Sequence, residues 1–544
     1  MTLNLRHPFD GRLAGLALLG AAHALSFAPG PLPPWALPYI QIFSLAILAY
    51  HALRAPSAGA AARYGFAFGF GNFACGLYWL YISMHFYGGM ALPLAISAVL
   101  LLAAALALYV ACATALARWL AGIWSASSYS GARQLFTVAL WASSWTLTEW
   151  LRGTLFTGFP WLNIGYAHIE GVLAPWAPIM GVYGVAWLAA FASAAIALLA
   201  CAKDTKNDAK AAVGVGLAIV SGLIGIGLGH VAWTKPQGDP LIVRLVQGNI
   251  PQSEKFDPVL MNRGIATYLE LAALPPKTPD GEPDLIVLPE TVMPLFQDSI
   301  APETWQKWRD VAAQRNAHIL MGVPLRDQRD GTMRYTNSAI AFDASTPLAA
   351  LTQAAPPQRY DKHHLVPFGE FIPPGFRWFV DAMKIPLGDF DRGEARQPVF
   401  QIEGQRIAPD ICYEDVFGEE IIRSVRDHEV HGPGATILVN LSNLAWFGDS
   451  WSLRQHLQIS RMRALESGRP MIRATNTGMT AAIDPTGWVR AQLDPQRIGV
   501  LDVEVQGTAG MTPYVKYGNL PVLAVSLLLI AIGFFRRGQT LHWV

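Results

Sequence analysis

The stretch Arg406-Ile-Ala-Pro-Asp-Ile-Cys-Tyr-Glu-Asp415 passes from an apolar run to a cluster of polar residues at Cys412. This pattern is typical of a buried strand that ends in a polar turn. Cys412 is also the one cysteine between about Asp239 and Gly510. Long apolar segments flank that region on both sides, so the sequence predicts a soluble domain with a lone thiol between membrane anchors.

Outward from this stretch, apolar runs alternate with helical patterns. Several runs are continuous in Ile, Val and Leu, as expected for strands buried on both faces. Strands are predicted at Leu241–Val246, Leu285–Leu288, Ile319–Val323, Ser338–Phe342, Arg406–Ile411, Thr436–Leu441, Met471–Ala474 and Thr480–Ile483. Helices are predicted at Pro258–Leu274, Thr304–Arg315 and Ser452–Ser467. Together they indicate an α-β-β-α sandwich or a related layered α/β fold.

Composition supports a membrane protein. With 544 residues, 52% hydrophobic and 15% charged, the chain is too apolar for an ordinary soluble enzyme and too long for one domain. A net charge of +1 with no basic run gives no sign of a nucleic-acid partner. The four cysteines form no CxxC pair and no metal-ligand spacing, so we expect no metal and no cofactor.

Eight segments are apolar over the length that a bilayer requires. We expect spans at residues 11–28, 36–53, 64–86, 91–117, 135–151, 177–201, 212–233 and 519–535. The predicted organisation is a seven-helix transmembrane domain at 1–238, a soluble domain at 239–510, and a closing helix with a short tail at 511–544.

Lys and Arg near the ends of these segments predict the orientation. The basic loops all fall on one side if there are eight spans, with Arg152 as the clear exception. Both termini are then cytoplasmic, and the soluble domain lies on the outer side, which in a bacterium is the periplasm. In that oxidising compartment Cys412 is either reactive or an inert core residue, and the spacing of the cysteines leaves both open.

Three polar residues directly follow predicted strands: Glu290, Lys362 and Cys412. Ligand sites of layered α/β folds gather beyond strand ends, so the three could share one site. Glu290 could accept the thiol proton, while Lys362 and the backbone N–H of Tyr413 could stabilise an oxyanion. Each also has a structural interpretation, since a Glu after a strand often caps a helix and a loop Lys is usually solvated. Spacing alone does not prove that they converge.

Longer motifs distinguish between the catalytic and the structural interpretation of these residues. In order along the chain they are Val246-Gln-Gly-Asn-Ile-Pro-Gln252, Leu288-Pro-Glu290, Tyr360-Asp-Lys-His-His-Leu-Val-Pro-Phe-Gly-Glu-Phe371, Ile411-Cys-Tyr-Glu414, Asn440-Leu-Ser-Asn-Leu-Ala-Trp-Phe-Gly448, Gln455-His-Leu-Gln458, Arg461-Met-Arg-Ala-Leu-Glu466 and Arg473-Ala-Thr-Asn-Thr-Gly478. Over nearly the whole chain this set resembles the apolipoprotein N-acyltransferases, the membrane-embedded family within the nitrilase (carbon–nitrogen hydrolase) superfamily.

The resemblance implies a catalytic triad of Glu290, Lys362 and Cys412. It also implies supporting roles in the active site for Glu370, Tyr413 and Glu414, and Glu370 is expected to position Lys362 or to assist proton transfer.

The remaining matches concern the substrate entrance. Phe256 stands where the family often has Trp, and Leu444 stands where it tends to have Asp. Trp446 and Phe447 are expected either on a mobile arm over the membrane-facing entrance or as ordinary packing aromatics.

The implied activity is two-step acyl transfer. An acyl chain passes from a phospholipid, by resemblance phosphatidylethanolamine, to the Cys412 thiol and then to the α-amine of a diacylglyceryl-cysteine at an apolipoprotein N-terminus. We expect a monomer in the bacterial inner membrane. The nearest alternative is a membrane-tethered nitrilase-type amidase that transfers the acyl group to water. A transporter or a lipid-binding scaffold is disfavoured, because the spans carry few polar residues, Glu149 and His23 among them.

Overall fold

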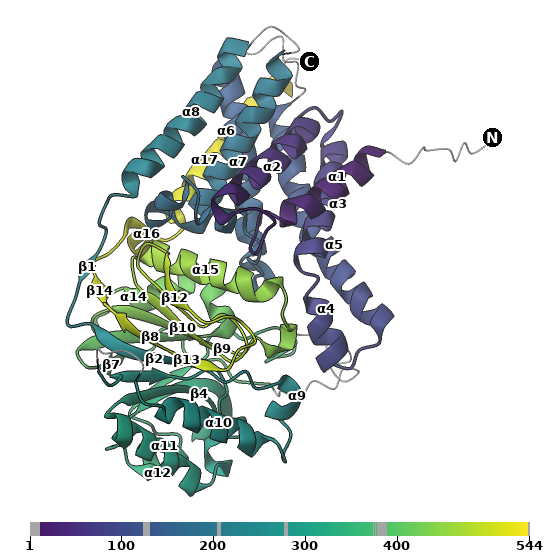
Figure 1. Ribbon diagram of the computed structural model, residues 1–544. Helices are drawn as coiled ribbons and strands as arrows, with labels where there is room; N and C mark the ends of the chain where they lie inside the picture. Colours follow the sequence, from purple (N-terminus) through teal and green to yellow (C-terminus); the bar gives the residue numbers. More distant parts are fainter. Residues whose placement is uncertain are drawn as a thin grey trace. The chain divides into compact units, whose positions relative to one another are not determined.

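The computed structural model describes residues 11–122, 131–203, 208–276, 281–373, 375, 377 and 389–541 (Figure 1). The chain divides into two compact units. A helical unit comprises the described residues up to Tyr81, Leu92–Val231 and those from Asn519 onward. An α/β unit comprises Ile82–Ala91 and Ala232–Gly518.

The helical unit consists mainly of α-helices, with several 3-10 turns between them. The helices are α1 (Gly11–Ala24), α2 (Leu37–Leu53), α3 (Ala58–Gly76), α5 (Leu92–Ala121), α6 (Gly131–Arg152), α7 (Ala177–Lys203), α8 (Asp208–Leu228) and α17 (Leu520–Leu541), with 3-10 turns η1 (Pro34–Ala36), η3 (Leu155–Thr157), η4 (Ile164–His168) and η5 (Ala174–Trp176). Within the described residues, four helical stretches are long and apolar enough to cross a bilayer: Pro34–Leu53, Leu92–Ala121, Ala174–Cys201 and Leu520–Arg537. The other predicted spans coincide with shorter or more polar helices, so the number eight stays a prediction.

The predicted span 64–86 is wrong as a single helix. Helix α3 ends at Gly76, and the chain continues through the short α4 (Leu80–Ile82) and the π-helical turn η2 (Ser83–Tyr87). The indole N–H of Trp79 donates to the carbonyl of Gly76 at 3.1 Å, so a helix-terminal carbonyl is satisfied where the helix stops. The apolar character continues across this break, which is why hydropathy did not detect it.

Close packing and internal pairing stabilise the helical unit. A Cβ on Gly20 would lie 1.9 Å from the carbonyl oxygen of Phe68, so α1 and α3 approach each other only because this residue is glycine. The buried Glu149 lies 3.1 Å from Arg152 and accepts from the backbone N–H of Ile164. Arg152, the exception in the charge pattern, is therefore neutralised within its own helix.

The α/β unit contains two six-stranded sheets. The first has the order β13-β2-β3-β4-β5-β6, from β13 (Gly499–Val505), β2 (Leu241–Gln247), β3 (Leu285–Val287), β4 (His318–Arg329), β5 (Thr332–Phe342) and β6 (Gln358–Asp361). The second has the order β12-β11-β10-β9-β8-β7, from β12 (Val489–Gln492), β11 (Ala481–Ile483), β10 (Met471–Thr475), β9 (Ile437–Ser442), β8 (Gln405–Ile411) and β7 (Phe400–Ile402). Three adjacent strands are parallel in each sheet, β2, β3 and β4 in the first and β10, β9 and β8 in the second, and every other neighbouring pair is antiparallel.

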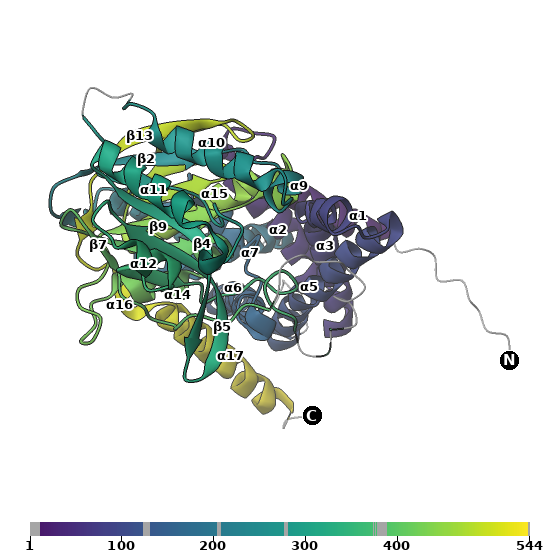
Figure 2. The same ribbon diagram turned by 90° about the horizontal axis from the view of Figure 1, so that it is seen from below.

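Three hydrophobic cores define the layers. One core joins residues of both sheets, among them Val243, Val287, Ile407 and Val439, so the sheets pack face to face. The outer face of the first sheet packs against α10 (Met261–Ala273) and α11 (Pro302–Arg315), as Figure 2 shows. The outer face of the second packs against α14 (Gly418–Val425) and α15 (Trp451–Ser467). The α-β-β-α arrangement is confirmed.

The smaller elements complete the α/β unit. They are β1 (Lys235–Pro236), which pairs with β14 (Thr508–Ala509), the helices α9 (Gln252–Lys255), α12 (Leu348–Thr352) and α16 (Pro513–Tyr517), and the turns η6 (Gln297–Ser299), η7 (Cys412–Val416) and η8 (Ala445–Phe447). Because β3, β6 and β8 end next to Glu290, Lys362 and Cys412, all three predicted site residues follow strand ends.

Candidate active site

Cys412 sits at a sharp strand-to-helix turn. Strand β8 ends at Ile411, and η7 begins at Cys412, whose φ of +56° lies in the left-handed region that non-glycine residues rarely adopt. The main-chain carbonyl of Cys412 accepts from Nδ2 of Asn440 at 3.1 Å and from Nε2 of His456 at 3.2 Å. These two contacts hold the turn, and the side chain is left half-buried.

Lys362 is positioned by its backbone and by two carboxylates. Its N–H continues the pairing of β5 and β6 by donating to the carbonyl of Asn337 at 2.8 Å. Its Nζ lies 2.9 Å from the carboxylate of Glu370 and 3.4 Å from Oε1 of Glu290. With 1% of its surface exposed, this ammonium group is fixed between the two carboxylates.

Glu290 is held at both carboxylate oxygens. Oε1 accepts from Nδ2 of Asn337 at 2.9 Å, and Oε2 accepts from the backbone N–H of Asn443 at 3.0 Å. The backbone at Glu290 can lie close to β4 because residue 322 of β4 is glycine, where a Cβ would lie 2.7 Å from the Cα of Glu290. The structure thus brings Glu290 and Lys362 together, as the sequence suggested.

The three groups of this cluster, the Cys412 thiol, the Glu290 carboxylate and the Lys362 amine, have shifted pKa values. Burial raises the pKa of the Cys412 thiol well above its usual value, and Glu290 raises it further, while Lys362 opposes the rise. Burial works to raise the pKa of Glu290, but the charge of Lys362 and the hydrogen bond from Asn337 outweigh it and leave that pKa lowered. The pKa of Lys362 is raised, because Glu370 and Glu290 outweigh its burial. The resting cluster is a thiol beside a carboxylate and an ammonium ion.

Sequence reasoning missed two members of this cluster. Asn337 also donates to Glu370, at 2.7 Å, so one amide bridges both carboxylates. Lys255, on α9, is buried and donates from Nζ to the main-chain carbonyl of Glu290 at 3.0 Å. Burial lowers the pKa of Lys255 to about 8, although Glu290 and Cys412 work to raise it. The one sign of Lys255 in the sequence was its position next to the aromatic Phe256.

Glu414 ties the segment after β6 to the end of β8. Its Oε1 accepts from the hydroxyl of Tyr360 at 2.9 Å and from the backbone N–H groups of His363 and His364 at 2.7 and 3.0 Å. Its Oε2 accepts from the N–H of Ile411 at 2.7 Å. Burial raises the pKa of Glu414. This carboxylate therefore fixes Lys362 and Cys412 relative to each other through their neighbours.

Tyr413 points into an aromatic group. Its ring lies edge-on to Phe417 with ring centroids 5.1 Å apart, and near His364 at 5.8 Å. Tyr413 is 9% exposed, so its side chain serves as packing for the turn after Cys412.

A buried polar network lies behind Cys412. Nε2 of His456 is 2.7 Å from Oδ1 of Asp415, and Nδ1 of His456 accepts from the guanidinium of Arg473 at 2.8 Å. Ser460 donates to the other oxygen of Asp415. Nothing in the sequence motifs indicated that these residues support the Cys412 turn.

The predicted entrance aromatics lie in one cluster. Trp446 on η8 is 6.5 Å from Phe256 between ring centroids and 5.9 Å from Tyr87, which lies in the Ile82–Ala91 segment of the α/β unit. Phe447 packs against the core under α15. Leu444, the position where the family tends to have Asp, is 2% exposed and belongs to that same core, so it is a packing residue here.

Metal ligation has no counterpart in the described part of the chain, where no group of three or more His, Cys, Asp or Glu could hold an ion.

Two protein families match most of this chain. Residues 19–195 match the apolipoprotein N-acyltransferase N-terminal domain, and residues 230–514 match the carbon–nitrogen hydrolase family. An apolipoprotein N-acyltransferase of Bordetella bronchiseptica is 55% identical over 95% of this chain and 95% of its own. Those of Ralstonia nicotianae and Nitrosomonas europaea are 45% and 42% identical, over 96% and 97% of this chain and 92% and 99% of theirs.

The α/β unit, with its two sheets and its Glu290–Lys362 pair beside Cys412, is a carbon–nitrogen hydrolase domain. Both matched regions and the full-length relatives define the family of the whole chain. It belongs to the apolipoprotein N-acyltransferase family.

Proposed function

We propose that the protein transfers a fatty acyl chain from a phospholipid to the α-amine of the diacylglyceryl-cysteine that begins an apolipoprotein. The observation that carries this proposal is the relationship, at 55% identity over 95% of both chains, to a protein named for that activity. The buried cluster of Glu290, Lys362 and Cys412 supplies the chemistry, and Glu370, Tyr413 and Glu414 support it.

The first step forms a thioester. The Glu290 carboxylate accepts the Cys412 proton, and the sulfur attacks the carbonyl carbon of the phospholipid ester. Lys362, with a backbone N–H of the turn after Cys412, stabilises the resulting oxyanion. The ester C–O bond then breaks, and Glu290 returns the proton to the lysophospholipid alkoxide. The lowered pKa of Glu290 leaves its carboxylate ionised and able to accept a proton, while burial raises the pKa of the Cys412 thiol, so the thiol gives up its proton only as it attacks the ester.

The second step forms an amide. The α-amine of the acceptor attacks the thioester carbonyl, Glu290 accepts the amine proton, and the C–S bond breaks. The departing thiolate of Cys412 takes that proton, which restores the resting cluster. Water must be kept from the thioester during this step, since hydrolysis would release the acyl chain as free fatty acid.

Both substrates are lipids, and the chain has helices that suit a membrane. We propose phosphatidylethanolamine as donor, with Phe256, Trp446 and Phe447 near the lipid path. The proposed setting is the bacterial inner membrane, with the α/β unit periplasmic, both termini cytoplasmic, and the protein active as a monomer without a cofactor. The proposed domain limits are residues 1–238, 239–510 and 511–544.

The test is an acyl-transfer assay with the purified full chain, phosphatidylethanolamine and a synthetic diacylglyceryl-cysteine peptide. The proposal predicts a peptide heavier by one acyl group and an equal amount of lysophospholipid. A Cys412→Ala variant should form neither product. Release of free fatty acid with the peptide unmodified would support a hydrolase instead.

A further inference from the structure

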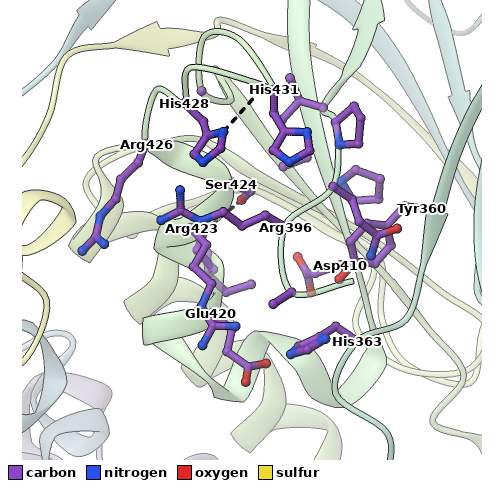
Figure 3. A pocket seen from close by; sticks show the side chains of 18 of the residues that line it. Tyr360, His363, Arg396, Asp410, Glu420, Arg423, Ser424, Arg426, His428 and His431 are labelled. Atoms are coloured by element: carbon purple, nitrogen blue, oxygen red, sulfur yellow. Dashed lines mark hydrogen bonds between the residues drawn. The ribbon is translucent and has the colours of Figure 1, made fainter. Parts of the chain in front are cut away.

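A pocket in the α/β unit lies apart from the cluster at Cys412. It opens between the segment before β7, helix α14 and the loop that leads to β9, and its space is about 720 Å³ including its open mouth. Figure 3 shows Arg396 and Arg423 extending into it from two of these segments, with His428 and His431 at one end. None of the predicted triad residues lines it.

Two arginines of this pocket, Arg396 and Arg423, have no anion at hydrogen-bond or ion-pair distance in the described part of the chain. Among the residues that the structure describes, none accepts a hydrogen bond from Arg396 or Arg423 or forms an ion pair with either. Arg426 also lines the pocket and donates to the main-chain carbonyl of Val515. Burial lowers the pKa of Arg426, and the charges of Arg396 and Arg423 lower it further, as expected when like charges crowd together.

The carboxyl groups that line the pocket are already engaged. Glu420 lies 3.2 Å from Nδ1 of His364. Glu414 accepts the four hydrogen bonds described above from Tyr360 and from backbone N–H groups. Burial raises the pKa of Asp410 well above its usual value, and Asp415 raises it further, so the charged form of Asp410 is disfavoured. Burial works to raise the pKa of Glu420, but its hydrogen bond with His364 and the charges of His364 and Arg423 leave that pKa lowered, so Glu420 is an anion near Arg423. Arg396 and Arg423 nevertheless have no hydrogen-bonded or ion-paired anion among the described residues.

We propose that this pocket binds a phosphate group, with Arg396 and Arg423 as its principal ligands and Arg426 as a supporting charge. A guanidinium presents two parallel N–H donors to two oxygens of one phosphate, so unpaired arginines that converge on a pocket suit this ligand. A bound dianion or monoanion also relieves the repulsion among the three cations. The phosphate belongs either to a phospholipid headgroup or to a soluble molecule.

The pocket shares a wall with the site at Cys412 but none of its reacting groups. Glu414 and Tyr360 line the pocket and are hydrogen-bonded to each other. Glu414 also accepts from the backbone N–H groups of His363 and Ile411, which neighbour Lys362 and Cys412. Phosphate binding is thus a property that can be measured independently of acyl transfer.

The experiment measures binding to the purified full chain in detergent. Isothermal titration with inorganic phosphate and with glycerol 3-phosphate, at constant ionic strength, tests the soluble source. Native mass spectrometry of the same chain released from phosphatidylethanolamine and phosphatidylglycerol nanodiscs counts retained phospholipids and tests the headgroup source. The variants are Arg396→Gln and Arg423→Gln. Arg263→Gln is the matched control, because Arg263 is an exposed arginine of the same unit outside the pocket.

The proposal predicts saturable binding in one of the two arms. Each pocket variant should weaken it about tenfold or more, the cost of a charge-assisted hydrogen bond, while Arg263→Gln leaves it unchanged. Arg396→Lys should retain part of the affinity, since lysine keeps the positive charge but lacks the two parallel N–H donors of a guanidinium. Unchanged thermal unfolding shows that the variants are folded. Absence of binding in both arms, or equal binding by all variants, overturns the proposal.

Discussion

Nε2 of His456 lies 3.2 Å from the main-chain carbonyl oxygen of Cys412. The other ring nitrogen, Nδ1, faces the guanidinium of Arg473 at 2.8 Å. Because a guanidinium can only donate, Nδ1 must accept, and the proton of a neutral imidazole is on Nε2. That N–H is shared between Cys412 and Asp415, so the network behind the turn holds the carbonyl of a residue in a left-handed conformation.

His456→Ala is therefore expected to slow thioester formation about tenfold to a hundredfold, because a small displacement of a reacting group is costly. The loss should appear in kcat with KM nearly unchanged, since His456 does not touch the substrate. His456→Gln should recover part of the rate, because its amide can donate to the Cys412 carbonyl. Steady-state kinetics of both variants check this; a change in KM alone contradicts it.

Lys362→Met should lower the rate of thioester formation by about 10²–10³, the usual cost of losing one oxyanion donor. The buried ammonium lies 2.9 Å from Glu370 and 3.4 Å from Glu290, so its position is fixed before substrate binds. The control is Lys307→Met, an exposed lysine on α11. Rapid-quench measurement of the acyl-enzyme provides the rate, and similar rates in the two variants would exclude this role for Lys362.

Lys255 should support the Cys412 thiolate below about pH 8. Its pKa is lowered from 10.5 to about 8, so its charge is lost as the pH rises through that value. The test uses a background in which Cys75, Cys112 and Cys201 are replaced by Ala. At pH 7, iodoacetamide should alkylate Cys412 faster when Lys255 is present than in the Lys255→Met variant of the same background. The ratio of the two rates should fall towards one by pH 9.5. A ratio that does not vary with pH contradicts the prediction.

Glu414→Gln should destabilise the α/β unit more than Tyr360→Phe. The carboxylate accepts four hydrogen bonds, and an amide group placed at either oxygen turns an acceptor into a donor that faces N–H groups. Leaving such buried groups unsatisfied costs about 1–3 kcal/mol each, whereas Tyr360→Phe removes one bond. Thermal unfolding of both variants measures the difference, and equal melting temperatures would falsify the assigned role.

The sequence predicted the interior of the α/β unit better than its edges. All eight predicted strands occur, because continuous Ile, Val and Leu runs such as that of β9 are buried on both faces. Strand β13 was missed because it contains the charged Asp502, whose buried side chain pairs with the buried Arg244 at 2.7 Å. Polar β6 was missed for a similar reason. Charges in strands are interpretable only once their partners are known.

The site was predictable as a set of residues, and its supporting groups were not. Motifs pointed to Glu290, Lys362 and Cys412, but Asn337 lies in a strand with no local signal. It reaches Lys362 because β5 and β6 pair in the register that aligns Ser338 with Asp361. Long-range registers of this kind depend on tertiary pairing.

The most direct test of the account is the intact mass of the full chain after incubation with phosphatidylethanolamine alone, beside Cys412→Ala. The account predicts that the wild type gains one acyl mass, that hydroxylamine removes it, and that the variant gains nothing. An unmodified wild type, or the same adduct on the variant, would contradict the assignment of Cys412 as the nucleophile.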